Sequence, residues 1–363
     1  MNKNTQAIIK TLQILGLLYL FLLSIELIGD GFKLFGKDFA EALMETTASP
    51  IVGLFIGILV TSLVQSSSTV TSIVVGMVAA GTLTISGAIP IVMGSNIGTS
   101  VTNTIVSLGS VTRRNEFQKA FSAAVIHDYF NILTVLILFP FQISFNVLGF
   151  LSKNLASLFV GSSGVSFKSP LKVIVAPVAS WFEELLNKNP IVIVIIALVF
   201  LFVALRFIVK VLKSVFLNKA ENFFDKVIFK STFTAFLFGL VLTVLVQSSS
   251  ITTSLIVPIA GSGILTLYQV FPYTVGANIG TTITALLASL VTGKTEALIV
   301  AFAHFLFNVI GAVLFLSIPF MRKIPIWGAK KISEVVYKNR YISIIYLIIL
   351  FYVIPLLVIF LFS

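Results

Sequence analysis

A tract of one glutamine and three serines occurs twice in this chain, both times between apolar residues. The first copy lies in "LVQSSSTVTS" (63–72) and the second in "LVQSSSITTS" (245–254). Hydroxyl and amide groups donate hydrogen bonds, and the start of a helix adds free backbone N–H groups and a positive dipole end. Each tract could therefore bind an anion. Neither stretch contains lysine or arginine, so the anion would have no fixed countercharge.

A second polar motif also occurs twice, as "GSNIGTSVT" (94–102) and "GANIGTTIT" (276–284). Two glycines around an asparagine weaken a helix, so the motif predicts an interrupted helix with free backbone carbonyls. Carbonyls with threonine and asparagine oxygens suit a hard cation such as sodium. The alternative is that glycine and threonine only allow close helix packing. Unpaired buried charge is costly, so a cation site beside an anion site predicts cation-coupled anion transport.

The two motifs belong to an internal repeat. A shift of 182 residues aligns 57–108 with 239–290, and 23 of these 52 pairs are identical. Such halves are typical of transporters whose binding site lies at the repeat interface. The predicted domains are a first transmembrane repeat (1–150), a connecting segment with an interfacial helix at "SWFEELLNKNP" (151–189), and a second, inverted repeat with a C-terminal transmembrane helix (190–363).

The composition indicates a membrane protein. Apolar residues make up 58% of the chain and charged residues 10%, whereas globular domains carry roughly a quarter charged residues. Apolar runs near the roughly 20 residues that span a bilayer recur along the chain. The expected spans are 11–29, 86–108, 117–140, 191–209, 268–290, 297–319 and 342–361. The predicted class is an all-α polytopic membrane protein.

The stretches around the serine tracts are too short to be ordinary spans. Pro50–Val64 and Thr69–Ala80 each fall below the roughly 20 residues needed. We therefore expect a re-entrant helical hairpin with the tract at its tip, the alternative being one long helix with a polar patch. One half then has three crossings, an odd number, so the second half is predicted to be inverted.

The basic residues support the same topology. Segments 1–10, 109–119, 206–230 and 320–340 hold 17 of the 24 lysines and arginines. Cytoplasmic loops are enriched in these residues. We therefore expect a protein of the inner or plasma membrane whose N-terminus lies in the cytoplasm. The net charge of +11 then reflects topology, and no nucleic-acid partner is expected.

Several other chemistries are excluded. The chain has no cysteine and two histidines, which rules out disulfides, thiolate catalysis and a histidine-rich metal site. His127 and Asp128 lack the context of a Ser-His-Asp hydrolase, so no enzyme is expected. The spacing His-x-x-x-Asn at 127–131 and 304–308 predicts interhelical hydrogen bonds instead. Asp128 remains a candidate for tuning an ion site.

The stretch "TSLVQSSSTVTSIVVGMVAAGTLTISGAIPIVMGSNIGTSVTNTIVSL" (61–108) resembles the type II sodium-dependent phosphate cotransporters, and "LVQSSSITTSLIVPIAGSGIL" (245–265) with "GANIGTTITALLASL" (276–290) resembles their second repeat. The resemblance covers most of the chain and is to a bacterial-type member without a PhoU domain. It implies a symporter that imports inorganic phosphate with Na⁺ as coupling ion, by alternating access and without a covalent cofactor.

The family motif assigns roles to individual residues. The resemblance implies that phosphate is held by the two hairpin tips, Gln65, Ser66, Ser67 and Ser68 with Gln247, Ser248, Ser249 and Ser250. It implies that sodium is held by Gln247, Ser248, Thr281 and Thr284. The mirrored candidates are Gln65, Asn96, Thr99 and Thr102, with Asn278 in the second copy.

The residues alone leave an alternative substrate open. Hydroxyl and N–H groups bind any tetrahedral oxyanion, so a transporter or channel for sulfate or arsenate remains the second hypothesis. The expected partners are phosphate, Na⁺ and membrane lipid, and a homo-oligomer is compatible with the sequence.

The charge distribution generates a direct test of topology. Single cysteines at Thr112 and Asn222 are expected to react with a membrane-impermeant thiol reagent only from the cytoplasmic side, and one at Thr292 only from outside. The natural chain has no cysteine and so gives no background signal. Labelling of positions 112 and 292 from the same side would contradict the inverted arrangement.

Overall fold

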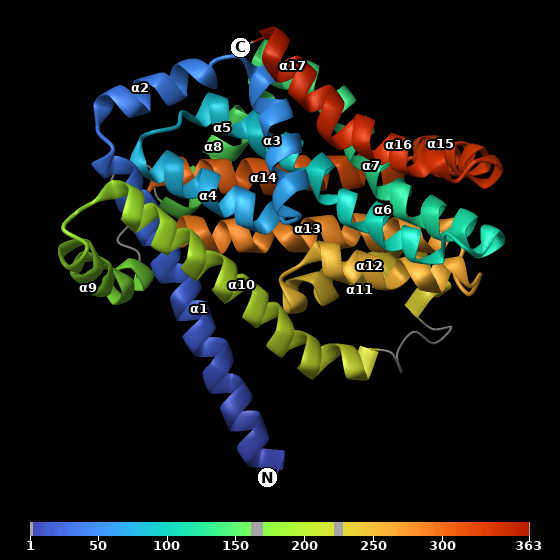
Figure 1. The fold of residues 1–363 in the computed structure, drawn as a ribbon, viewed down its shortest axis with the longest axis horizontal. Helices are drawn as coiled ribbons and strands as arrows, with labels where there is room; N and C mark the ends of the chain where they lie inside the picture. The colour runs from blue at the N-terminus through green and yellow to red at the C-terminus, as the bar shows by residue number, and fades with distance from the viewer. Residues whose placement is uncertain (1–2, 161–169, 221–227, 363) are drawn as a thin grey trace.

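The computed structural model describes residues 3–160, 170–220 and 228–362. Every regular element in these ranges is helical, and no strand occurs in them (Figure 1). The all-α class expected from the sequence is confirmed.

Six helices of the described part are long and apolar enough to cross a membrane. They are Ile8–Leu34 within α1 (Lys3–Leu34), α7 (Arg114–Phe145), Pro190–Ile208 within α10 (Pro190–Ala220), α13 (Leu267–Thr292), α14 (Thr295–Ser317), and Tyr341–Phe362, which combines α16 (Tyr341–Ile348), a π-helical segment (Ile349–Val353) and α17 (Ile354–Phe362). A seventh candidate joins α2 (Lys37–Thr46) to α3 (Pro50–Val64) across a bend of 97°. The chain is a multi-pass membrane protein.

Each serine tract lies where one short helix ends and another begins. The 15-residue α3 is followed by α4 (Ser67–Ala80, 14 residues), and the 15-residue α11 (Thr232–Val246) by α12 (Ser249–Gly261, 13 residues). At 1.5 Å per residue, none of these helices reaches the roughly 20 residues needed to cross a bilayer alone. The break at each tract excludes the alternative of one long helix.

The two helix pairs lead in opposite directions. Figure 1 shows α2 and α9 (Pro170–Leu185) at one end of the bundle and α15 (Pro319–Lys338) at the other. From its break α4 runs toward the end with α2, whereas α12 runs toward the end with α15. Opposite courses of α4 and α12 are expected for an inverted repeat, and the inversion of the whole second half remains a prediction.

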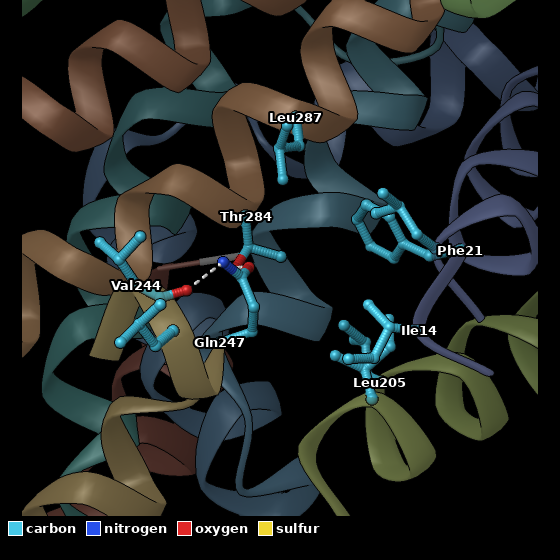
Figure 2. Close-up of a pocket in the computed structure, with 10 residues that line it drawn as sticks. Ile14, Phe21, Leu205, Val244, Gln247, Thr284 and Leu287 are labelled. Carbon is cyan, nitrogen blue, oxygen red and sulfur yellow. Dashed lines mark hydrogen bonds between the residues drawn. The ribbon is translucent and has the colours of Figure 1, made fainter. Parts of the chain in front are cut away.

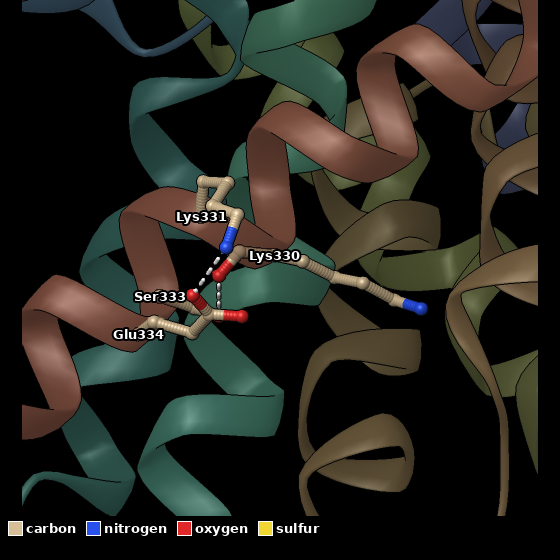
Figure 3. Close-up of polar contacts among 4 residues, drawn as sticks. All are labelled: Lys330, Lys331, Ser333 and Glu334. Carbon is tan, nitrogen blue, oxygen red and sulfur yellow. Dashed lines mark hydrogen bonds and ion pairs between the residues drawn. The ribbon is translucent and has the colours of Figure 1, made fainter.

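Helix α15 is amphipathic and basic, and it meets the starts of two core helices. The Arg322 guanidinium donates to Thr232 Oγ1 at 2.6 Å and to the Tyr268 carbonyl at 2.9 Å. Figure 3 shows the exposed face farther along the helix, where Lys331 pairs with Glu334 at 3.0 Å and Lys330 extends away from it. These lysines lie in a segment that the charge pattern places in the cytoplasm.

Apolar packing holds the two halves together. Helices α1 and α10, the first helix of each half, pack along one another, and one apolar cluster contains residues of both helices with α4. A second cluster joins α7 to α11, α12, α13, α14 and α15. The halves therefore share their core instead of folding as separate units.

Glycines bring the short helices very close to the helices that carry the second motif. A Cβ added to Gly94 of α5 (Ile85–Thr99) would collide with the Leu54 carbonyl oxygen of α3. In the second half, a Cβ on Gly276 of α13 would collide with the Phe236 carbonyl oxygen of α11. Both pairs are related by the 182-residue shift of the sequence repeat. The repeat therefore reproduces a backbone contact as well as a set of side chains.

The sequence predicted that the helix would be interrupted at both copies of the second motif. This prediction is wrong for the second copy, and in the first copy the break lies after the Asn-Ile-Gly-Thr sequence. Helix α13 is continuous from Leu267 to Thr292 and includes the whole motif. In the first half a break falls at Ser100, between α5 and α6 (Val101–Ser107), after the Asn-Ile-Gly-Thr sequence. The glycines serve close helix contact, as the packing alternative proposed, and so they do not unwind the chain.

The break at Ser100 has a local cause. The Ser100 N–H bonds to the Ile97 carbonyl at 3.2 Å, three residues back, so the Asn96 carbonyl does not receive the usual helical bond. That carbonyl accepts instead from Asn131 Nδ2 at 2.6 Å. A side chain from α7 thus replaces the missing helical bond at the break.

The domain boundaries remain a prediction. Helix α8 (Val147–Val160) runs across the boundary expected at residue 150. The expected interfacial helix corresponds to the end of α9, and Asn187 and Lys188 with positive φ follow it.

Of the positions chosen for cysteine labelling, Asn222 lies outside the described residues. Thr292 is buried, so the exposed Lys294 is the better position for the external label.

The glycine contacts predict a selective loss of stability. Gly94→Ala is expected to lower the thermal unfolding temperature of the purified protein in detergent, because overpacking a helix contact costs about 1–3 kcal/mol. Gly16→Ala is the matched control, since a Cβ at Gly16 would meet no atom within 4 Å. Equal unfolding temperatures for the two variants would contradict the packing described.

Candidate ion-binding site

The two hairpin tips have the same backbone geometry. Gln65 ends α3 in the left-handed region with φ 58° and ψ 28°, and Gln247 ends α11 with φ 57° and ψ 25°. The serines that follow are extended, with φ −151° at Ser66 and −154° at Ser248. A non-glycine residue with positive φ is uncommon, so its presence at both tips shows that the turn is a shared, specified feature.

Each tip is the capped start of a helix. Ser66 Oγ accepts from Thr69 N at 3.2 Å, and Ser248 Oγ accepts from Ile251 N at 3.4 Å. The cap uses one of the free N–H groups at the start of each helix, and the remaining ones have no partner within the helix. Ser67 and Ser249 occupy the first position of α4 and α12. Each tip therefore offers N–H and hydroxyl donors in one place.

The surroundings of the tips contain no buried positive side chain. Among the side chains whose burial the structure describes, Glu26 and Asp128 are the buried carboxylates, and no lysine or arginine is buried. The electrostatic attraction for an anion must therefore come from helix N-termini and from accompanying cations.

The structure brings two of the predicted sodium residues together. Thr284 Oγ1 donates to Gln247 Oε1 at 2.9 Å, and Gln247 Nε2 donates to the Val244 carbonyl at 2.7 Å. Thr281, one turn before Thr284, donates to the Ala277 carbonyl at 3.1 Å. Gln247 at the tip of the second hairpin thus contacts Thr284 of α13.

The mirrored candidates are arranged differently. The Gln65 side chain is exposed, and the Thr102 hydroxyl is buried without a hydrogen-bond partner. Thr99 donates to the Ser95 carbonyl at 2.8 Å, as Thr281 does in its own helix. The contact between glutamine and threonine is therefore formed in the second half, between Gln247 and Thr284, and not in the first, between Gln65 and Thr102.

The asparagines of the second motif are held across the repeat interface. Asn278 Oδ1 accepts from His127 Nε2 at 2.7 Å, and Asn278 Nδ2 donates to Asn131 Oδ1 at 2.6 Å. In the mirrored arrangement, Asn96 Oδ1 accepts from Asn308 Nδ2 at 3.1 Å and faces His304 Nε2 at 3.3 Å. The His-x-x-x-Asn unit of each half binds the asparagine of the other, which confirms the predicted interhelical role.

Asn103 was not predicted from the sequence, yet it joins three helices. Its Nδ2 lies 3.2 Å from His127 Nδ1, and its Oδ1 accepts from Thr253 at 2.9 Å and from Ser254 at 3.2 Å. The second hairpin is thereby tied to α6 and α7. The corresponding position in the second half is Ala285. This difference between the two repeats was the one sequence feature that could have singled out Asn103.

Asp128 lies in a polar pocket formed by α6, α7 and α16. Tyr346 donates to Asp128 Oδ2 at 2.9 Å, and the hydroxyls of Ser100 and Thr104 lie beside the carboxylate. Asp128 Oδ1 and Thr104 Oγ1 are buried and have no partner that meets hydrogen-bond geometry in the described part. This group of oxygens could accept a cation.

A bundle with broken helices at matching places in two halves, and polar groups that converge between the halves, has the design of a secondary membrane transporter. The chain belongs to the Na⁺/Pi-cotransporter family, whose model matches residues 20–166 and 193–323.

Named relatives are similar over nearly the whole chain. The sodium-dependent phosphate transport protein 2B of Homo sapiens is 33% identical over 450 residues, which cover 97% of this chain and 65% of that protein. The protein 2A of Rattus norvegicus is 34% identical over 429 residues, which cover 97% of this chain and 67% of that protein. The chain thus spans about two thirds of the length of these relatives. No solved structure matches the chain at a significant level.

The role of Asn103 can be measured by a double-mutant cycle. Asn103→Ala and Thr253→Val are each expected to lower the unfolding temperature, and the double variant to lose less than the sum. Contacting pairs show coupling energies of about 0.5–3 kcal/mol. Ser157→Ala, at an exposed position of α8, serves as the uncoupled partner in a control cycle with Asn103→Ala. Additive losses for Asn103 and Thr253 would show that the contact carries no energy.

Proposed function

We propose that the chain is a sodium-coupled symporter that imports inorganic phosphate across the cytoplasmic membrane. The anion is held between the two hairpin tips, Gln65–Ser68 and Gln247–Ser250. The observation that carries the proposal is the matched pair of capped helix starts in a core that buries no lysine or arginine. The names of the family and of its relatives support sodium and phosphate as the transported species.

The tips supply donors but little charge. Backbone N–H groups, serine hydroxyls and the helix dipole favour an oxyanion, each dipole corresponding to about half an elementary charge. An anion brought into a low-dielectric core needs more compensation than that. Sodium ions bound nearby provide it, so the anion and the cations enter together.

The sodium ligands that we propose are oxygen atoms close to the second tip. Gln247, Ser248, Thr281 and Thr284 are the primary set, and the contact between Gln247 and Thr284 supports it. Their mirrored positions in the first half, Gln65, Asn96, Thr99 and Thr102 with Asn278 from the second, form the other candidate set.

Asp128 adds a negative charge to the cation sites. Its Oδ1 and the Thr104 hydroxyl are buried without partners, and an oxygen-rich pocket with unsatisfied acceptors suits a hard cation. The neighbouring Asn131 binds both Asn96 and Asn278. A cation at Asp128 would therefore lie one helical turn from a residue that contacts both copies of the second motif, and its binding could affect both.

Alternating access follows from the inverted arrangement that we propose. The opposite courses of α4 and α12 support it (Figure 1), as does the exchange of His–Asn contacts between halves. With the N-terminus in the cytoplasm, the first hairpin enters from outside and the second from the cytoplasm. Each would then open on one side of the membrane in turn.

Transport of another oxyanion is the second candidate function. The donors at the tips, hydroxyl and N–H groups, bind phosphate, sulfate and arsenate alike. The same uptake measurement separates them when unlabelled sulfate or arsenate is added as a competitor.

Uptake of labelled phosphate into proteoliposomes tests the proposal. With an inward sodium gradient the protein is expected to accumulate phosphate, and with choline in place of sodium it should not. Ser67→Ala and Ser249→Ala should each weaken the apparent phosphate affinity, since a hydrogen bond to a charged group contributes about 1.5–3 kcal/mol. Ser157→Ala is the control for a serine on an exposed helix face.

Three results would each count against the proposal. Equal uptake in sodium and choline would remove sodium coupling. Wild-type phosphate affinity in both tip variants would remove the shared anion site. Complete competition by sulfate at concentrations equal to phosphate would favour the second candidate function.

A further inference from the structure

An apolar cavity lies beside the second hairpin tip. It has a volume of about 320 Å³ and is formed by α1, α10, α11 and α13. Figure 2 shows Ile14 and Phe21 of α1 and Leu205 of α10 on one side, and Gln247 and Thr284 on the other. The cavity thus reaches from the first helices of the two halves to the proposed sodium residues.

The lining excludes an ion as the occupant. Eight of the ten lining side chains are apolar, and the other two are Gln247 and Thr284. These two are bonded to one another, and Gln247 is also bonded to Val244. A charged species would lose its hydration and gain few polar contacts, which is strongly unfavourable. The chemistry of the cavity suits a hydrocarbon.

The cavity is continuous with the apolar outer surface of the bundle. Leu245, which lines the cavity, is 37% exposed, and Leu15 and Phe207, which neighbour lining residues in sequence, are 56% and 42% exposed. The most apolar stretches of α1 and α10 are each only 28% buried inside the protein, so much of both helices faces the lipid. The cavity therefore reaches the apolar outer surface at Leu245.

We propose that this cavity binds one acyl chain of a membrane lipid, which enters between α1, α10 and α11 and ends against the Gln247–Thr284 pair. Hydrocarbon chains are the apolar molecules present at this depth of a membrane. Binding one fills a space that water would occupy at a cost, because an apolar cavity offers water no partners.

The bound chain also has a mechanical consequence. It packs against Val244 and Leu245, the last turn of α11, and so favours the tip conformation in which Gln247 accepts from Thr284. This consequence rests on the proposed function, because it concerns residues proposed to bind sodium. The binding itself does not depend on that function. The mirrored tip differs, because its Gln65 is exposed.

Photo-crosslinking tests the binding. The purified protein is reconstituted in phosphatidylglycerol vesicles that contain a small fraction of the same lipid with a diazirine near the end of one acyl chain. After irradiation, adducts are located by peptide mass spectrometry. Adducts on Thr284 are diagnostic, because Thr284 is 1% exposed and lipid on the outer surface cannot reach it. The measurement needs neither sodium nor phosphate, so its failure and a failure of the transport proposal are separate results.

Two tryptophan variants make the test specific. Leu18→Trp fills the cavity and is expected to abolish adducts on Thr284, while adducts on outer residues persist. Leu15→Trp adds the same bulk to α1 at a position exposed to lipid and should leave the Thr284 adducts unchanged. Ile14→Trp, a second filling variant, covers the case in which Leu18→Trp does not fold.

The outcomes are distinct. Thr284 adducts that disappear only in the filling variants establish the site. The proposal is overturned if the wild type gives adducts on outer residues alone, or if Leu15→Trp and Leu18→Trp reduce Thr284 adducts equally. Displacement of the adducts by a small apolar molecule but not by excess unlabelled lipid would also overturn it, because the cavity would then belong to a different ligand.

Discussion

The absence of water in the bilayer core is the constraint on which this structure depends. A polar group there has to find its partner within the protein. The chain places glutamines, serines, asparagines, histidines and an aspartate inside an apolar helical bundle. Buried serines such as Ser62 and Ser95 donate to carbonyls of their own helix, whereas the asparagines of the second motif are paired with side chains of other helices. Asn96 and Asn278 each bind a histidine and an asparagine of the opposite half. These reciprocal bonds join the halves at residues of the proposed ion sites. Within each half, glycine contacts between α3 and α5, and between α11 and α13, hold the first helix of the hairpin against the helix that carries the asparagine.

The same constraint explains the link between anion and cation. Two broken helices present free N–H groups and serine hydroxyls, which attract an oxyanion, but the described core holds no basic side chain to neutralise it. An ionised carboxylate at the buried Asp128 would add negative charge to the core and so favour cations. In the function that we propose, such a site binds its anion well only when sodium is also bound. Coupling is then a consequence of electrostatics and needs no separate device.

The sequence predicted much of this arrangement, and the reasons for its failures are physical. The repeat placed the tips at Gln65 and Gln247, because the left-handed turn and the serine cap are local features that follow from the residues present. The His-x-x-x-Asn spacing predicted interhelical bonds because two polar side chains one turn apart on an apolar helix need partners on another helix, although it did not indicate which residues those partners are. The continuity of α13 was not predicted, because the effect of a glycine depends on the helix packed against it. Asn103 and the apolar cavity join segments that are far apart in the chain, and no local pattern indicates such contacts.

Equilibrium titration of the purified protein tests the central claim most directly. Phosphate affinity is measured in sodium chloride and in choline chloride at equal ionic strength, and sodium affinity is measured with and without phosphate. The account predicts that sodium tightens phosphate binding and that phosphate tightens sodium binding by the same factor, as linkage requires. Equal phosphate affinity in sodium and in choline would contradict it.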